Sequence, residues 1–162
     1  MNTSSDVTFV RVSPTHPDAE VLIEEVQQEY LVRYGSRDET PVDPAEFEPP
    51  HGVFFVGYLG DDPVVTGAWR RRRDVTAQGT DDAAEVKRMY VSPRARGLGL
   101  ARAMLAHLED TARIAGAEVM ILESGTGQPE ALALYESAGY TRIPGFAFHK
   151  DSPRNRSYAR RL

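Results

Sequence analysis

The chain has 162 residues, a length that predicts one domain spanning residues 1–162 with a single core. Its hydrophobic content of 41%, charged content of 27% and net charge of −5 are typical of a soluble globular protein and argue against general nucleic-acid binding. The absence of cysteine excludes disulfides, thiolate metal sites and a cysteine acyl-enzyme.

The N-terminal residues and the apolar runs give no sign of export or membrane insertion. The opening MNTSSD lacks a basic region followed by an apolar one, and the longest apolar runs are only a few residues. The four histidines show no metal-ligand spacing. We therefore expect a cytoplasmic protein with no metal, no membrane and no nucleic acid as partner.

Charge is divided unevenly along the chain. Residues 1–50 hold eleven acidic residues against three arginines, a balance of −8, whereas residues 83–162 hold eight acidic against twelve basic residues, a balance of +4. This division suits an anionic ligand on the C-terminal half and a cationic one near the N-terminal half. A solvated acidic helix and an ordinary basic surface explain it equally well.

Hydrophobic periodicity predicts helices and strands in mixed order. Apolar side chains recur at helical spacing over 17–35 and from 100 to 116, and Pro129 and Gly139 bracket another helix. A short helix at 44–47 lies within an acidic, proline-rich loop. The predicted strands are 7–12, 53–59, 64–73, 86–91, 119–122, 141–143 and 155–162. This order predicts a mixed α/β domain.

These elements also predict which strands pair and which side chains are buried or exposed. The first two strands after the acidic loop form a hairpin, and the four arginines that end its second arm, residues 70–73, are predicted to be a solvated strand end. The helix from 100 presents one apolar stripe and carries an outer Glu109/Arg113 pair. Strand 119–122 is expected to lie parallel to 86–91, with that helix as the crossover. Tyr30 and Tyr34 are predicted to be core or pocket-wall residues.

The segment between strand 86–91 and the following helix has the features of an anion site. Gly97 and Gly99 let the backbone approach a ligand closely, and the unpaired N–H groups of the helix's first turn point into the same loop. Arg94 and Arg96 can add full positive charges, so a phosphate or pyrophosphate is the expected ligand. Similar loops also close ordinary strand-helix units that bind nothing. The sequence lacks a P-loop and the third glycine of a dinucleotide-binding fingerprint.

Two motifs resemble those of the GNAT superfamily of N-acetyltransferases. The string Arg94-x-x-Gly97-x-Gly99, preceded by 85–91, resembles its acetyl-CoA motif, and 127–140 resembles its later helix. The resemblance covers residues 83–143. It implies a central, partly antiparallel sheet of six or seven strands with helices on both faces. It also implies acetyl-CoA as cosubstrate, bound by Met89, Tyr90, Val91, Arg94, Arg96, Gly97, Leu98, Gly99, Leu100, Ala101 and Gln128.

The same resemblance implies two catalytic residues. Tyr135 takes the position of the general acid that protonates the departing thiolate, although a core tyrosine on an apolar helix face is the alternative. Glu85 precedes the cofactor-binding segment and is the predicted base, although it can instead pair with Lys87 or an arginine of the neighbouring strand. Gln128 departs from the family pattern, because many relatives have an asparagine there.

The resulting hypothesis is an N-acetyltransferase that moves acetyl directly from acetyl-CoA to a primary amine, with a small molecule favoured over a peptide as the acceptor. The alternative is a non-catalytic acyl-CoA-binding or regulatory module. Because dimers are frequent in the superfamily, the resemblance also suggests a homodimer. Carboxylates of the acidic loop are predicted to attract the amine; they are Asp38, Glu39, Asp43, Glu46 and Glu48.

Overall fold

A computed structural model describes residues 4–38 and 43–162, so the predicted acceptor residue Glu39 lies outside the described residues. The strands are β1 (Val7–Arg11), β2 (Gly52–Leu59), β3 (Asp62–Arg72), β4 (Ala83–Val91), β5 (Val119–Gly125), β6 (Thr141–Ile143) and β7 (Asn155–Arg161). The helices are α1 (Pro17–Tyr34), α2 (Leu100–Ile114) and α3 (Pro129–Ser137), with short 3-10 turns η1 (Ser4–Asp6), η2 (Pro44–Phe47) and η3 (Pro93–Ala95).

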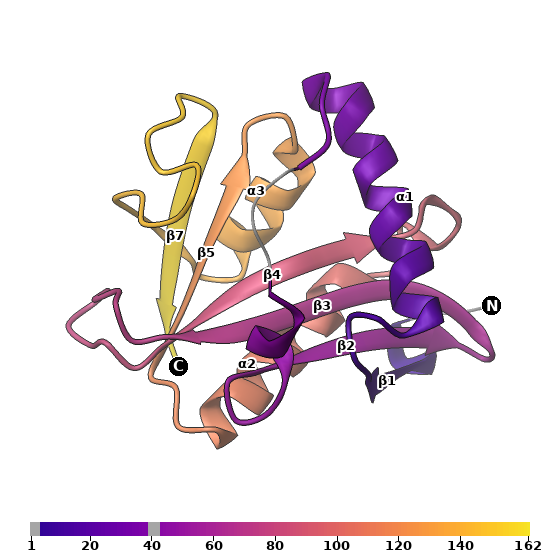
Figure 1. Ribbon diagram of the computed structural model, residues 1–162, viewed down its shortest axis with the longest axis horizontal. Coiled ribbons are helices and arrows are strands. Elements are labelled where there is room, and N and C mark those ends of the chain that lie inside the picture. The colour runs from indigo at the N-terminus through magenta and orange to yellow at the C-terminus, as the bar shows by residue number, and fades with distance from the viewer. Residues whose placement is uncertain (1–3, 39–42) are drawn as a thin grey trace.

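The seven described strands form one sheet in the order β1-β2-β3-β4-β5-β7-β6 (Figure 1). Neighbouring strands are antiparallel except for β4 and β5, which run parallel and are connected through α2. This arrangement confirms the predicted mixed, partly antiparallel sheet and the parallel strand after the crossover helix. It also brings the carboxyl ends of β4 and β5 to the same side of the molecule, where open α/β sheets generally bind ligands.

Helix α1 covers one face of the sheet. It begins at Pro17, with the imidazole of His16 accepting a hydrogen bond from the backbone of Asp18, and it ends at Gly35 in the left-handed conformation (φ 77°). Leu22 and Val26 pack in a buried cluster with strand residues such as Phe54. Tyr30 and Tyr34, near the end of α1, lie beside the carboxyl end of β5.

Helix α2 covers the opposite face. Its predicted apolar stripe is buried from Leu100 to Ala112, in the cluster that contains Phe55. Phe55 follows Phe54 in β2, and successive side chains of a strand point to opposite faces, so this cluster lies on the other face from α1. Met104 approaches β3 so closely that a Cβ on Gly67 would lie 2.5 Å from its Cγ. Glycine is needed at that position, and the two layers of helices enclose the sheet as predicted.

The prediction that the arginines at the end of β3 are solvated is wrong for Arg70, Arg71 and Arg72 and is confirmed for Arg73, whose side chain is 68% exposed. The side chains of Arg70 and Arg72 are only 13% and 15% exposed, and both donate to the carboxylate of Glu85 on β4. Arg71 donates to Asp82 and to the carbonyl of Ala115. The register of β3 against β4 places Arg70 opposite Glu85, and Arg72 lies two residues further on the same face, so both bury their charge by pairing with Glu85 rather than reaching water.

The predicted Glu109/Arg113 pair on α2 is also wrong. Glu109 is buried and accepts hydrogen bonds from the hydroxyl of Tyr140 (2.7 Å) and from Arg160 (2.8 Å). Arg113 pairs with Asp110 instead. The carboxylate of Glu109 turns inward because the tertiary structure supplies two donors there, which helical spacing alone does not reveal.

Candidate active site

The site begins where β4 and β5 separate. The two strands pair at Ala83, Ala84 and Glu85 of β4, opposite Val119 to Ile121 of β5, and no further pairing between them follows in the described chain. A register irregularity opposite Gly67 interrupts the β3–β4 ladder, and Arg88 there has φ 56°. Such a bulge bends a strand and increases its twist. Figure 1 shows β4 and β5 diverging toward their carboxyl ends.

The divergence leaves one side of β4 open. Tyr90 and Val91 pair with Thr66 and Val65 of β3, on the side away from β5. The backbone of the predicted segment 89–91 therefore has a free edge toward β5, and an extended ligand can pair with it as an added strand. The structure thus brings the three predicted residues of this segment to the opening.

The predicted pyrophosphate loop lies between η3 and α2. Gly97 has φ 82° and nothing within 4 Å of where a Cβ would stand, whereas Gly99 has φ 78° and is the N-cap residue of α2 without a side-chain cap. Leu98 and Leu100 turn their side chains into the core. The loop therefore presents open backbone and the uncapped N–H groups of α2, including that of Ala101, to a ligand.

The two arginines of this loop already have carboxylate partners. Arg94 donates through Nε and Nη2 to Asp62 (3.1 and 3.0 Å) and through Nη1 to Glu25. Arg96 donates to Glu29 and to the carbonyl oxygen of Val91. Their charge is thus partly neutralised from within the chain, so backbone N–H groups contribute a larger share of the loop's attraction for an anion than the sequence predicts.

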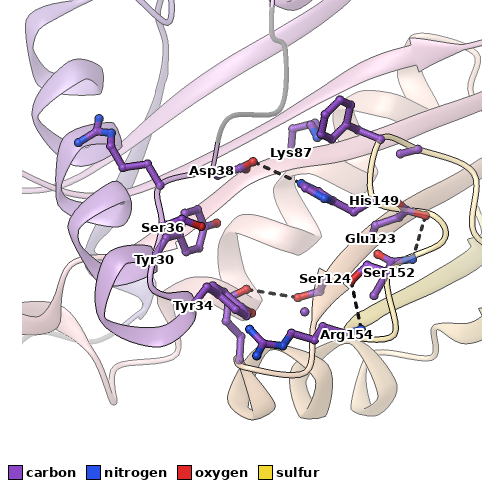
Figure 2. A pocket seen from close by; sticks show the side chains of 16 residues that line it. Tyr30, Tyr34, Ser36, Asp38, Lys87, Glu123, Ser124, His149, Ser152 and Arg154 are labelled. Carbon is purple, nitrogen blue, oxygen red and sulfur yellow. Dashed lines mark hydrogen bonds and ion pairs between the residues drawn. The ribbon is translucent and has the colours of Figure 1, made fainter.

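A pocket of about 380 Å³ opens beside the divergence (Figure 2). Its walls are the last turn of α1 with residues 36–38, Lys87 of β4, the end of β5 and the segment that connects β6 to β7. Tyr30 and Tyr34 line it, which confirms the pocket-wall alternative predicted for them. Of the acidic-loop carboxylates predicted to attract an amine, Asp38 lines the pocket, whereas Glu46 pairs with Arg70. Asp43 caps η2 and Glu48 follows it.

The structure places Glu85 away from this pocket. Its side chain is 1% exposed, and its Oε1 accepts hydrogen bonds from Arg70 and Arg72, both at 2.8 Å. Lys87 Nζ lies 3.9 Å from its other oxygen. The pairing alternative for Glu85 is thus what the structure has, and its role as a base stays a prediction.

Glu123 is the carboxylate that does line the pocket. It lies on β5 two residues beyond Ile121, the last residue paired with β4. Its Oε2 accepts three hydrogen bonds from neutral donors, the backbone of Phe146 (2.9 Å), Asn155 (3.2 Å) and Ser157 (2.7 Å). These bonds fix the orientation of a carboxylate that no cation of the described chain pairs with. The sequence analysis missed it, although its place at the carboxyl end of a buried strand was the available signal.

Tyr135 lies on α3, on the other side of the opening. Its ring packs against Tyr140 and Tyr158, whose hydroxyls donate to Glu109 and Glu136. For the hydroxyl of Tyr135 itself, residues 4–38 and 43–162 offer no hydrogen-bond partner. Burial, with a smaller contribution from Tyr30, raises the pKa of Tyr135, so its hydroxyl keeps the proton that a general acid needs.

Gln128 is the N-cap residue of α3 and lines the pocket. Its side-chain oxygen lies 3.5 Å from the hydroxyl of Ser124, and its backbone N–H donates to Gly125. The structure thus directs this predicted cofactor residue toward the pocket.

The described residues include neither a membrane-spanning helix nor a cluster of metal-binding side chains. Across 4–38 and 43–162, no helix has both the length and the apolar character needed to cross a bilayer. The same part of the chain brings together no group of three or more histidine or acidic side chains suited to a metal ion.

Comparisons with known proteins agree with this geometry. The family model described as "Acetyltransferase (GNAT) family" matches residues 20–140. An "IAA acetyltransferase" from Azospirillum brasilense is 32% identical over 135 residues, covering 83% of this chain and 84% of that protein. A candidate acyl-CoA N-acyltransferase from Klebsiella pneumoniae has a similar structure, with TM-score 0.73, 26% identity, and 96% and 97% of the two chains covered.

A GNAT-family acetyltransferase from Staphylococcus aureus Mu50 shares the fold, with TM-score 0.75 and 18% identity over 96% of this chain and 99% of that one. The family model spans well over half of the 162 residues, and it includes the opening between β4 and β5, the glycine loop and all of α3. The sequence motifs, the fold and these matches lead to one assignment: the chain belongs to the GNAT family of acetyltransferases.

Proposed function

We propose that the protein is an N-acetyltransferase that moves an acetyl group from acetyl-CoA directly to the primary amine of a small molecule. The observation that carries this proposal is the meeting of three features at one place. The open edge of β4, the uncapped start of α2 with its glycines, and a pocket with an oriented carboxylate all adjoin the β4–β5 opening.

The residues present fit acetyl-CoA. The loop at Gly97 has room where a Cβ would otherwise intrude, and the uncapped N–H groups at the start of α2 suit a pyrophosphate. Residues 89–91 offer backbone hydrogen bonds to an extended pantetheine chain. When bound, acetyl-CoA supplies the thioester whose acetyl group is transferred and whose thiol is released.

We assign the general base to Glu123 rather than to Glu85. An aliphatic ammonium has a pKa near 10 and must lose a proton before its nitrogen can attack the acetyl carbon. Glu123 faces the pocket, and its hydrogen bonds come from neutral groups, so it can accept that proton. The lone pairs of Glu85 Oε1 are engaged by two guanidinium groups beneath the pocket.

Tyr135 acts as the general acid in this proposal. As the carbon–sulfur bond breaks, the phenol of Tyr135 gives a proton to the leaving sulfur. The proton that the nitrogen loses as the amide forms returns to the phenolate, and the proton taken up by Glu123 passes to solvent, so both residues return to their starting states. The raised pKa of Tyr135 favours the protonated phenol at neutral pH. No cysteine is present to form an acyl-enzyme, which supports direct transfer.

The test is thiol release from acetyl-CoA with a panel of small amines, alongside the shift in melting temperature that acetyl-CoA causes. A ligand at a hundred times its dissociation constant adds about 2.7 kcal/mol to stability. A shift together with amine-dependent thiol release supports the proposal. A shift without release for any amine supports the non-catalytic acyl-CoA-binding module instead, and no shift at millimolar acetyl-CoA contradicts both. Homodimerisation and a cytoplasmic location remain predictions.

A further inference from the structure

The charges that line the pocket are mostly paired. Both oxygens of Glu24 accept hydrogen bonds from Arg37, at 2.9 and 2.8 Å. His149 Nε2 lies 3.6 Å from Asp38 Oδ1. The guanidinium group of Arg37 and the imidazole of His149 therefore have carboxylate partners within the chain, so they add little net attraction for a charged ligand.

Arg154 differs from them. It precedes β7 and lines the pocket, and its backbone is held by bonds with Ser152 and Thr126. For its guanidinium group, the described part of the chain provides neither a carboxylate nor another hydrogen-bond acceptor. Figure 2 shows this side chain extending toward Tyr34. The pocket therefore contains an arginine whose donors are available to a ligand.

Tyr34 provides a second unused donor at the same place. Its side chain is packed so tightly on the end of β5 and the following turn that a Cβ on Gly125 would lie 2.2 Å from its hydroxyl oxygen and a Cβ on Gly127 2.5 Å from its ring. Its hydroxyl is buried and has no hydrogen-bond partner among the described residues. Burial raises the pKa of Tyr34, while the charge of Arg33, the close backbone N–H of Gly127 and the charge of Arg154 oppose that rise. A buried hydroxyl without a partner is costly, which points to a ligand atom there.

Lys87 adds positive charge from another wall. Its Nζ is 3.9 Å from Glu85, beyond hydrogen-bond distance, and that carboxylate is already shared by Arg70 and Arg72. Of the two acidic side chains of the lining, Asp38 lies beside His149, whereas Glu123 accepts hydrogen bonds from neutral groups. The pocket thus has two cations and one carboxylate to match with the charges of a ligand.

We propose that the acceptor is an amine that also carries a carboxylate, with an α-amino acid as the class, and that Arg154 and Tyr34 bind this carboxylate while Glu123 faces the amine. This inference rests on the proposed acetyl transfer for its chemistry but concerns binding. Arginine suits such a role because its planar fork of N–H groups matches a carboxylate in two parallel hydrogen bonds.

The size and the lining of the pocket agree with this class. A volume of about 380 Å³ is near the lower end of small-molecule sites, which span roughly 300–1,000 Å³. Tyr30 offers an apolar wall, and Phe148 at the rim is 64% exposed with its ring against His149. These surfaces favour an amino acid with an apolar or aromatic side chain.

The experiment compares the standard L-amino acids with their C-terminal amides, which keep the amine and the side chain but lack the carboxylate. Thiol release from acetyl-CoA is measured for each pair, and calorimetric titration measures binding of the same compounds without acetyl-CoA. We expect the preferred amino acids to have a KM and a dissociation constant about ten- to hundredfold below those of their amides.

Arg154→Gln should raise the KM and the dissociation constant of the amino acids by about ten- to hundredfold and leave those of the amides unchanged. Arg161→Gln is the matched control, because it removes the same charge at the opposite end of β7, where Arg161 contacts the carbonyl oxygen of Gln78. It should leave both compounds unaffected.

The outcomes separate this inference from the proposed function. Carboxylate-dependent binding that is lost in Arg154→Gln supports the inference even where no thiol is released, in which case only the proposed acetyl transfer fails. Equal binding of amino acids and amides, or an Arg154→Gln protein that still distinguishes them, overturns the inference whether or not acetyl transfer occurs.

Discussion

Glu85 and Glu123 are two carboxylates on the same face of neighbouring parallel strands, yet their surroundings differ. Glu85 pairs in register with Ile121, and Glu123 lies two residues further along β5, so both side chains point to the α1 side of the sheet. Glu85 lies before the strands part, buried beneath Arg70 and Arg72. Glu123 lies after they part, among neutral donors beside the pocket.

This difference teaches that the position relative to the opening and the charge of the neighbours decide what a carboxylate can do. Where the strands are paired, a buried carboxylate needs cations to offset its desolvation, and these cations engage its lone pairs. Where the strands have separated, solvent and ligand reach the group, and neutral hydrogen bonds suffice to orient it. The following predictions test that division, in order of decreasing effect.

The largest expected effect is on turnover in Glu123→Gln. This change preserves the shape of the side chain and removes the basic carboxylate, so acetyl transfer should fall by about 10²–10⁴-fold with acetyl-CoA affinity little changed. Glu85→Gln, corrected for the folded fraction, should retain most of its turnover. If Glu85→Gln is the inactive variant and Glu123→Gln the active one, the base is Glu85.

Glu85→Gln should instead lose stability. Removal of this carboxylate leaves the mostly buried guanidinium groups of Arg70 and Arg72 without their shared partner, an effect of about 3–5 kcal/mol on the free energy of unfolding. Glu46→Gln is the control, because Glu46 is the other carboxylate partner of Arg70. The side chain of Glu46 is 41% exposed, so this change should cost less than about 1 kcal/mol. Urea denaturation measures both, and similar losses would contradict the contrast.

A mutation in the cofactor loop should affect acetyl-CoA binding, whereas mutation of the carboxylates should not. Gly97→Asp places a negative side chain where phosphate is expected and requires a backbone angle that favours glycine, so it should abolish the stabilisation of about 2.7 kcal/mol that saturating acetyl-CoA provides. Glu123→Gln should keep that stabilisation. A Gly97→Asp protein that folds and still shows the full shift would make the loop structural only.

Tyr135 and Tyr140, whose rings pack against each other, offer a smaller contrast. Tyr135→Phe should reduce turnover markedly while stability barely changes, because its hydroxyl has no partner within the described residues. Tyr140→Phe should do the reverse, since it removes a buried hydrogen bond to Glu109 worth about 1.5–3 kcal/mol. The melting temperature and the turnover of both variants test this contrast. A destabilised but fully active Tyr135→Phe protein would show that Tyr135 takes no part in the mechanism.

The smallest effect concerns Lys87, which lines the pocket and lies 3.9 Å from Glu85. Burial lowers the pKa of Lys87, so the unfolded chain binds its proton more tightly, and stability from this group should rise as pH increases from the folded pKa toward about 10.4. Lys87→Met should remove that alkaline rise. Lys150→Met, at the only other lysine of the chain, is the control, and an unchanged pH profile in Lys87→Met would contradict the prediction.

The sequence by itself determined the elements and the cofactor loop, because both depend on local patterns. Apolar periodicity predicted the stripe of α2, and the prolines and glycines that bracket α1 and α3 predicted their ends. The glycines at 97 and 99 predicted a loop with open backbone, which the structure has. A short segment of chain contains the physical cause in each case, so neighbours far along the sequence are not needed.

Tertiary structure alone decided which charged groups meet. The register of β3 against β4 placed two arginines on Glu85, and inward packing gave Glu109 the partners Tyr140 and Arg160 in place of Arg113. The pocket joins the last turn of α1 with the segment before β7, so Tyr34 and Arg154 are neighbours only in the folded chain. Electrostatic roles follow from distance and burial, and residues far apart in sequence set both.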